Sequence, residues 1–314
     1  MKKSIKIIAV TAILAVVMLF SLSGCSSTPY ELYLNTNWSL DEVEIAEYNY
    51  NYEFGDKKAL TGTLTTKIFD AKNKTFKVNE TEYKDRKSGT YYEYTLEVEN
   101  NGHNDVIHAE VYFDSYAGQN FRPRHSYIYK DTAEGISEQE IKYENKKISA
   151  TITNDGKKQT FKADLKNGLV YDNVELQAIA RTMAFDQRGT LLFQTPIFER
   201  NNIYPKQVQM GLTATYAGNK KYDSGDKKDQ YVEDKFIHIN DGKPFNAGIC
   251  LLAANDKPSG LPQQFLVVNG KVTIDGKEFV QPILQITEGT KEKGLSTYIL
   301  AHMSKVAFDP AEFN

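Results

Sequence analysis

The sequence predicts a mainly β protein, built as a strongly bent antiparallel sheet or unclosed barrel wrapped round one α-helix at about 172–186. Three observations lead to this fold class. The 314-residue chain contains 20 Tyr and 16 Phe, and aromatic residues favour strands. Many short runs alternate apolar and polar residues, which is typical of half-buried strands. Pairs such as Asn269-Gly270 and Asp275-Gly276 separate these runs, as expected for tight hairpin turns.

The N-terminus has the features of an export signal. Lys2, Lys3 and Lys6 give a positively charged start, and an apolar stretch follows from Ile7 to Phe20. This stretch is shorter than the roughly 20 residues that a membrane-spanning helix needs, and it has the length of a signal-peptide core.

The end of this stretch, Leu22-Ser23-Gly24-Cys25, resembles the lipobox of bacterial lipoproteins. The resemblance implies that a diacylglyceryl group is attached to the thiol of Cys25, and that cleavage leaves Cys25 as the first mature residue. Two acyl chains hold a protein firmly to a membrane. The expected organisation is a signal peptide at 1–24, a lipid-anchored tether at 25–41 and a β-rich extracytoplasmic domain at 42–314, with a seam near 201–206.

Alternating runs predict the strands one by one. The first begins near Glu42, where Tyr48, Tyr50 and Tyr52 share one parity and Val43 has the other. This change of parity predicts a bulge near Ala46 or a short first turn. Further strands are expected at 60–69, 75–83, 91–99, 105–113, 125–129, 138–143, 147–153, 158–165, 190–198, 208–216, 232–239, 245–253, 264–268, 272–285 and 297–308.

One segment departs from the strand pattern. Asp172 is a suitable helix N-cap, and Glu175 three residues later has capping-box spacing. Leu176, Ile179 and Met183 then recur at helical intervals. A single helix among so many strands must bury its apolar stripe, and the concave side of the sheet is the natural place.

Composition and motifs restrict the chemistry. Loss of three Lys with the signal peptide changes the net charge from −3 to −6, and an acidic chain without a basic stripe argues against nucleic acid as a partner. The chain has no zinc-ligand spacing, nucleophile elbow, P-loop or dinucleotide fingerprint. We therefore expect no catalytic residue, no metal and no cofactor. Asp223–Asp234 is expected to be a solvated loop, with a calcium-binding loop as the alternative. Cys250 is expected to be a small buried hydrophobic residue.

Two groups of residues are candidates for binding. Arg122 and Arg124 share a strand face and offer the guanidinium fork that binds carboxylate or phosphate, the alternative being surface charge at a sheet edge. The aromatic stripes either fill a core or line a partly open cavity, since Tyr combines apolar area with a polar tip. In the second case the expected lining residues are Tyr50, Tyr52, Tyr92, Tyr94, Tyr127, Leu176, Ile179, Met183 and Phe193.

The pattern from Glu42 to Phe308 resembles exported bacterial proteins built as unclosed antiparallel barrels with a helical lid, such as the lipoprotein-carrier family and its membrane-anchored, lipid-binding relatives. It also resembles an uncharacterised family of exported bacterial β-rich proteins. In that family "YDNVELQAIARTMAF" corresponds to the inserted helix, "GTLLFQTPIF" to the next strand and "STYILAHMSKVAFDP" to a final strand. The resemblance carries over no catalytic residue.

The export signal, the aromatic faces and the single helix together predict the function. We expect a membrane-anchored, extracytoplasmic, non-enzymatic lipoprotein that binds a lipid-like or otherwise hydrophobic molecule. The first alternative is a surface module that binds an envelope protein or a glycan. The second is a cell-envelope hydrolase, for which two carboxylates facing each other in a cleft would be the sign.

Overall fold

The structure is a computed structural model. It describes residues 42–55, 60–85, 89–114, 121–144, 147–164, 169–182, 190–199, 202–213, 236, 238–243, 245–254, 263–290 and 294–314. Within these residues the chain is mainly β-strand with one α-helix, α2 (Glu175–Ala180). The lipobox with Cys25, Met183 and the acidic run Asp223–Asp234 lie outside the described residues. No helix in the described ranges is long and apolar enough to cross a bilayer.

Most strands in the described part of the chain belong to one sheet of 15 strands. All neighbours pair in antiparallel fashion except β11 and β12, which are parallel. In spatial order the strands are β10 (Lys157–Asp164), β9 (Lys147–Asn154), β8 (Gly135–Tyr143), β7 (Arg122–Thr132), β6 (His103–Asp114), β5 (Gly89–Asn100), β2 (Leu60–Asp70), β1 (Glu42–Glu53), β19 (Gly294–Ala307), β18 (Ile283–Thr290), β15 (Gln263–Val268), β14 (Ala247–Ala254), β13 (Asn202–Thr213), β12 (Thr190–Glu199) and β11 (Leu169–Val170).

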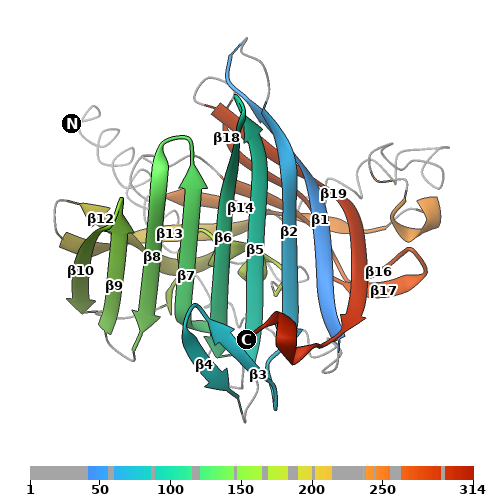
Figure 1. Cartoon of the computed structure of the whole chain (residues 1–314). Coiled ribbons are helices and arrows are strands. Elements are labelled where there is room, and N and C mark those ends of the chain that lie inside the picture. The colour runs from blue at the N-terminus through green and yellow to red at the C-terminus, as the bar shows by residue number, and fades with distance from the viewer. Residues whose placement is uncertain are drawn as a thin grey trace, which may run out of the picture.

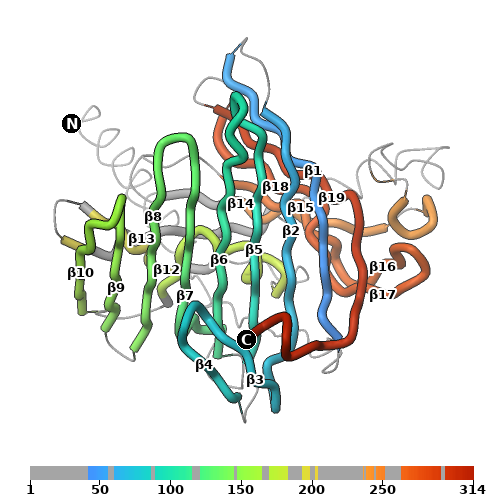
Figure 2. The backbone as a smooth tube through the Cα atoms, in the orientation of Figure 1, coloured from blue at the N-terminus to red at the C-terminus, as the bar shows by residue number. Residues whose placement is uncertain are grey.

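The sheet bends back on itself and does not close. The strands β12, β13 and β14 lie behind β6 to β9 (Figure 1), and the same path can be followed in the backbone tube (Figure 2). The edge strands β10 and β11 do not pair with each other. Instead, Phe161 of β10 meets Phe198 of β12 with ring centroids 5.6 Å apart, and Ile203 of β13 joins the same apolar cluster as Ile141 of β8. Side-chain packing therefore seals the gap that backbone hydrogen bonds leave open.

The first strand shows why the apolar parity changes along it. Even-numbered residues such as Ala46 and Tyr48 lie in the main core, while Val43 lies in a second cluster on the outer face. The register with β19 does shift between Glu47 and Tyr48, but the extra residue is Ala301 of β19. The expected bulge is thus present, but it lies in β19 beside β1. Apolar residues change from odd to even positions along β1 for another reason, because both faces of this strand are covered.

The outer cluster lies beneath a hairpin and the C-terminal turn. The hairpin consists of β3 (Thr75–Val78) and β4 (Thr81–Lys84), and the turn is η4 (Pro310–Glu312). Phe69 stacks on Tyr91 with centroids 4.8 Å apart. Residues in or packed against this cluster are Val43, Ile45, Phe69, Ala71, Phe76, Val78, Tyr83, Tyr91, Tyr112, Tyr127, Phe308 and Phe313.

Two predicted strands are interrupted by turns. The run 75–83 is the β3–β4 hairpin, because Asn79 takes a positive φ of 52° between the two halves. The run 272–285 divides into β16 (Lys271–Ile274), β17 (Lys277–Val280) and the start of β18, with Asp275 at φ 50°. Within the predicted strand 232–239, the described Ile239 forms an isolated bridge to Ile274 and precedes the short turn η3 (Asn240–Gly242).

The helix α2 is shorter in the described residues than the prediction, and all of its residues are buried. The backbone N–H of Asp172 donates to the Glu175 carboxylate at 2.8 Å, which is one half of the expected capping box. Leu176 and Ile179 belong to the main core, together with residues of β1, β5, β6, β15 and β18. Just after α2, the Arg181 guanidinium contacts the Glu44 carboxylate of β1 at 2.7 Å, so the end of the helix is tied to the sheet.

Candidate ligand-binding cavity

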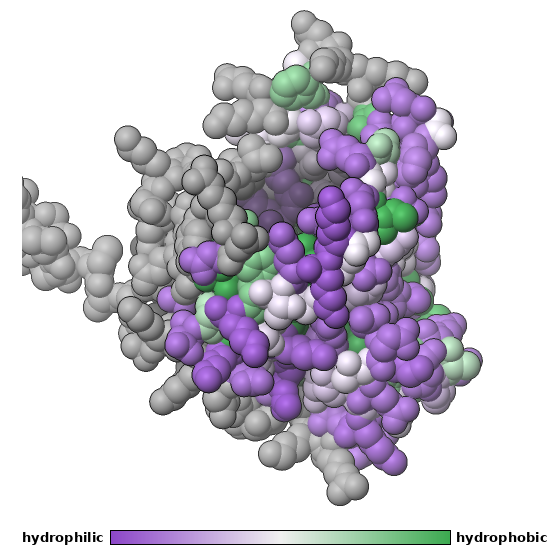
Figure 3. Space-filling model, turned by 60° about the vertical axis from the view of Figure 1, so that its left-hand side comes forward, coloured by the Kyte–Doolittle hydropathy of each residue, from purple (hydrophilic) through white to green (hydrophobic). Residues whose placement is uncertain are grey.

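A partly open cavity of about 490 Å³ lies between the inner face of the sheet and the segment that leads into α2. This volume is within the usual range of small-molecule sites. Seen from the side of the edge strands, the molecular surface is hollowed, and hydrophilic residues lie within the hollow and along one side of it (Figure 3). The residues that line the cavity are Tyr50, Tyr94, Leu96, Ile107, Ile128, Lys130, Ser137, Glu138, Gln139, Ile152, Asn154, Asp172, Asn173, Val174, Gln177, Glu288, Ser296 and Tyr298.

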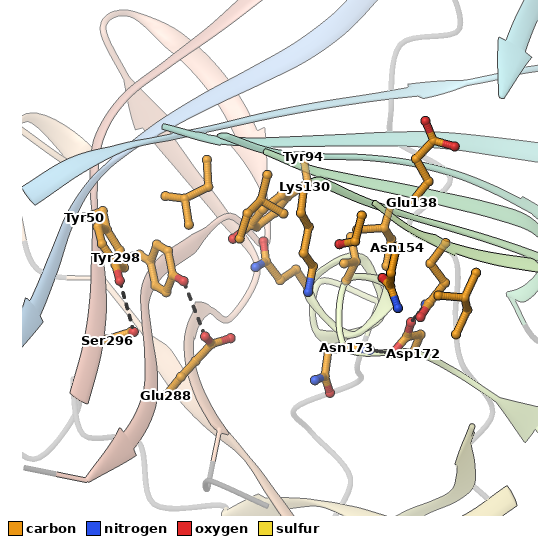
Figure 4. A pocket seen from close by; sticks show the side chains of 18 residues that line it. Tyr50, Tyr94, Lys130, Glu138, Asn154, Asp172, Asn173, Glu288, Ser296 and Tyr298 are labelled. Carbon is orange, nitrogen blue, oxygen red and sulfur yellow. Dashed lines mark hydrogen bonds between the residues drawn. The ribbon is translucent and has the colours of Figure 1, made fainter. Parts of the chain in front are cut away.

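One end of the cavity is aromatic and is built by cross-strand pairing. Tyr50 of β1 lies directly opposite Tyr298 of β19, and their ring centroids are 4.9 Å apart at an interplanar angle of 47°. The Tyr50 hydroxyl is 3.4 Å from the Ser296 hydroxyl, and Tyr298 donates to Glu288 at 3.4 Å (Figure 4). Because Glu288 is the cross-strand partner of Ser296, the sheet register fixes all four residues relative to one another.

The side chain of Glu288 is partly buried. Its partners are the Gln263 side-chain amide and the Tyr298 hydroxyl, both of which donate to it. Burial raises the pKa of Glu288. Burial, with the neighbouring Glu288 charge adding to it, also raises the pKa of Tyr94 and of Tyr298 well above the usual value for tyrosine. At neutral pH these hydroxyls therefore remain protonated and able to donate.

The other end of the cavity is polar. The Asp172 carboxylate accepts a hydrogen bond from the Gln139 side chain at 2.8 Å and from the Asn173 backbone N–H at 2.7 Å. Burial raises the pKa of Asp172, with these hydrogen bonds and the positive charge of Lys130 opposing the shift. Asn154 lies on the same side, and Lys130 extends between the two ends (Figure 4).

Two further carboxyls nearby are not presented to a ligand. Glu138 points away from the other lining side chains (Figure 4). Its negative charge adds to the effect of burial in raising the pKa of Tyr127, which packs against the outer cluster. Glu175 is fully buried beside the cavity, where its carboxyl accepts from the Tyr143 hydroxyl at 2.7 Å. Burial and the neighbouring Asp172 raise the pKa of Glu175 well above its ordinary value.

An apolar wall connects the two ends. Leu96, Ile107 and Ile128 lie on neighbouring strands of the sheet, and Ile152 and Val174 complete the wall. The alternation of β-strand side chains places these residues on the inner face, whereas the residues between them point outward. The cavity therefore offers hydrocarbon contact along its length and hydrogen-bonding groups at both ends.

The structure brings together some of the residues expected to line a cavity. Tyr50 and Tyr94 line it. Tyr92 lies behind it, and its hydroxyl donates at 2.7 Å to Gln177, which does line it. The remaining described candidates lie elsewhere: Leu176, Ile179 and Phe193 are buried in the main core, Tyr127 packs against the outer cluster, and Tyr52 lies beside Gly294.

The two arginines of the other candidate group form contacts within the chain. Arg122 donates to the backbone carbonyl of Glu144. The Arg124 guanidinium lies 3.3 Å from the Asp114 carboxylate. Neither residue lines the cavity. Cys250 is buried with a raised thiol pKa, as expected for a small apolar residue, and the described residues contain no group of His, Cys, Asp and Glu able to hold a metal ion.

The sequence analysis missed the half of the cavity that comes from the C-terminal strands. Glu288, Ser296 and Tyr298 are about 240 residues from Tyr50 in the sequence, and only the pairing of β1 with β19 brings them together. The one available signal was the alternation in "STYILAHM", which puts Tyr298 on the face of Leu300. No sequence pattern indicated that Lys130 and Gln177 line the cavity.

The fold and the cavity place the chain among β-rich proteins with an unclosed, barrel-like sheet and an interior cavity. No protein-family model matches the sequence, and no curated protein does. Among solved structures, the chain is similar to the crystal structure of a β-barrel-like protein of domain of unknown function DUF1849 from Brucella abortus. The two are 11% identical, the match covers 87% of this chain and 100% of the other, and the TM-score is 0.42.

Proposed function

We propose that this chain is a membrane-anchored, extracytoplasmic lipoprotein that binds an amphiphilic small molecule and catalyses no reaction. The observation that carries the proposal is the cavity of about 490 Å³, with an apolar wall between two polar ends. In this interpretation the bent sheet wraps the helix expected after Asp172, and the segment that leads into α2 forms the inner wall of the binding site with Gln177. The lipid on Cys25 holds the domain at the membrane, where amphiphiles are abundant.

The apolar wall supports an amphiphile over a fully polar ligand. Each methylene removed from water contributes about 0.8 kcal/mol, and Leu96, Ile128 and Val174 offer a surface along which a short chain lies. The polar ends supply orientation through a few hydrogen bonds, as is usual for ligand sites.

The placement of the carboxyls supports binding over hydrolysis. Asp172 and Glu288 are the cavity carboxyls that face inward, and they lie at opposite ends of it (Figure 4). A hydrolase that uses two carboxyls needs both beside the same bond. A glycan remains the second candidate ligand, because Tyr faces with Asn, Asp and Gln side chains also suit hydroxyl-rich molecules.

The experiment is mass spectrometry of organic extracts from the mature protein, purified in lipid nanodiscs. Asn154→Trp places a large ring at the cavity lining, and Lys158→Trp places the same ring at an exposed position of β10 as the matched control. An amphiphile recovered from the wild type and the control, and lost from Asn154→Trp, supports the proposal. Equal recovery from all three proteins contradicts it.

A further inference from the structure

We propose that the cavity selects amphiphiles that carry an ammonium group, held at the aromatic end against Glu288 and the faces of Tyr50 and Tyr298. This proposal rests on the proposed binding function and adds the chemical class of the ligand. It is carried by three features: a carboxyl without a cationic partner among the described residues, an aromatic wall beside it and the distribution of charge along the cavity.

The first feature is the environment of Glu288. Within the described part of the chain no Lys, Arg or His forms an ion pair with it, and its partners are the neutral groups of Gln263 and Tyr298. Two buried carboxyls of the protein meet cations, since Glu44 contacts Arg181 at 2.7 Å and Asp114 lies 3.3 Å from Arg124, whereas the buried Glu175 is held by the neutral Tyr143 hydroxyl. Removing a carboxylate from water, even in part, is costly when no counter-charge accompanies it. A ligand cation at this end of the cavity supplies that counter-charge.

The second feature is the aromatic wall. Tyr50 and Tyr298 lie side by side with centroids 4.9 Å apart, and both line the cavity with Tyr94. The face of an aromatic ring attracts a cation, and quaternary ammonium groups are commonly bound between such faces. Tyr298 also donates its hydroxyl to Glu288, so ring and carboxyl are held together as one unit.

The third feature is the asymmetry of charge. Lys130 extends between the two ends (Figure 4), and its positive charge opposes the rise in the pKa of Asp172 that burial causes. Among the described residues, the Lys130 charge acts on Asp172 at the polar end, whereas no described cation acts on Glu288 at the aromatic end. This arrangement orients a ligand, with its ammonium at Glu288, its apolar part along Leu96 and Ile128, and hydroxyl or amide groups towards Asn154.

The test compares three water-soluble probes with the same six-carbon tail: hexyltrimethylammonium, hexyl glucoside and hexyl sulfate. Binding is measured by isothermal titration calorimetry with the mature protein in nanodiscs, and empty nanodiscs give the blank. We expect the ammonium probe to bind at least ten-fold more tightly than the other two. Equal affinities for all three, abolished by Asn154→Trp, would leave the binding function intact and overturn the ammonium preference. Failure of all three to bind would overturn both.

Two variants connect the preference to the residue. Glu288→Gln keeps the size of the side chain and an oxygen that accepts from Gln263, but it removes the charge. We expect this variant to bind the ammonium probe at least ten-fold more weakly than the wild type, and the glucoside less than two-fold more weakly. Glu97→Gln removes a charge at an exposed position of β5 and leaves all three affinities unchanged. If Glu288→Gln binds the ammonium probe as the wild type does, the assignment to Glu288 is wrong.

The pH dependence gives a second readout. Among the described residues, the titratable groups that face Glu288 are Tyr50, Tyr94 and Tyr298, all with a raised pKa, so they stay protonated between pH 5 and 8. The pKa of Glu288 is raised too, and a cation binds only its ionised form well. Affinity for the ammonium probe therefore falls as the pH drops through this raised pKa, while affinity for the glucoside stays constant. Equal pH profiles for the two probes contradict the proposal.

Discussion

Substitution of Arg181 by Met tests how the wall of the cavity is anchored. The Arg181 guanidinium, just after α2, donates to the Glu44 carboxylate at 2.7 Å and to the backbone carbonyls of Val280 and Gln281 at 2.9 and 3.3 Å. Both charged side chains are less than a tenth exposed. Met keeps much of the packing volume and removes every one of these donors, so Arg181→Met isolates the polar contribution.

The expected loss of stability in Arg181→Met arises because the Glu44 carboxylate stays buried without its main partner. Removal of one partner of a buried ion pair costs about 3–5 kcal/mol. Lys305 lies 3.5 Å from the other oxygen of Glu44 and compensates in part, so we expect the lower limit of that range. For a domain of this size, a loss of about 3 kcal/mol corresponds to a decrease in Tm of about 6–12 °C.

The assay is urea unfolding followed by near-ultraviolet circular dichroism. Lys271→Met is the control, because the Lys271–Glu278 pair is half exposed on both sides and such pairs contribute about 1 kcal/mol or less. In a double-mutant cycle, the variant with both Glu44→Gln and Arg181→Met loses less free energy of unfolding than the two single variants lose together, and the difference is at least about 1 kcal/mol. A loss below about 1 kcal/mol for Arg181→Met, or strict additivity in the cycle, would refute the reasoning.

Three further predictions follow from other parts of the chain. Gly62→Ala lowers the free energy of unfolding by about 1–3 kcal/mol, because the new Cβ lies 2.1 Å from the carbonyl oxygen of Glu97; a stable variant with an unchanged urea midpoint contradicts this. The pKa of Glu175 is higher in the folded chain than in the unfolded chain. Its contribution to stability is therefore greatest at a pH below the pKa of the unfolded state, and it is lost as the pH rises through the pKa of the folded state. The urea midpoint of the wild type therefore decreases between pH 5 and 8, and Glu175→Gln reduces this slope; identical slopes would show that Glu175 is not the group responsible. Cys25→Ala abolishes metabolic incorporation of an alkyne-tagged fatty acid, measured by in-gel fluorescence, whereas Cys250→Ala leaves it unchanged; label retained in Cys25→Ala excludes the lipobox assignment.

Local patterns were sufficient to predict many of the strands, although two predicted strands are divided by turns. The alternation from Tyr91 to Glu99 and the signal at Asn100-Asn101-Gly102 predicted β5, its turn and β6 within two residues of their observed ends. The pattern also predicted a helix after Asp172, with Leu176 and Ile179 buried. These features depend on neighbours a few residues away, and such neighbours are visible in a sequence.

The assignment of faces needed information that a local pattern does not hold. Tyr91 and Tyr92 are adjacent and both buried, one in the outer cluster and the other in the main core. An alternating stripe separates the two sets of tyrosines without saying which set faces the interior. Tyr127 was expected at the cavity for this reason, yet it packs against the outer cluster, because the β3–β4 hairpin and the C-terminal turn cover that face of the sheet.

The aromatic end of the cavity depends on the sheet register across the whole chain. Tyr50 meets Tyr298 because β1 pairs with β19, and the single-residue shift at Ala301 sets which residues face each other beyond it. Without that pairing neither Glu288 nor Ser296 has any visible relation to the N-terminal tyrosines. Long-range pairing, rather than local propensity, assembles this end of the site.

The central claim is that the space between the sheet and α2 holds an amphiphile with its cationic group at Glu288. Crystallographic diffraction from protein soaked with hexyltrimethylammonium tests this most directly. We expect electron density for the probe within the cavity, with the trimethylammonium group against Tyr50, Tyr298 and Glu288 and the tail along Leu96 and Ile128. Side chains that fill this space, or density for the probe only on the outer surface, would contradict it.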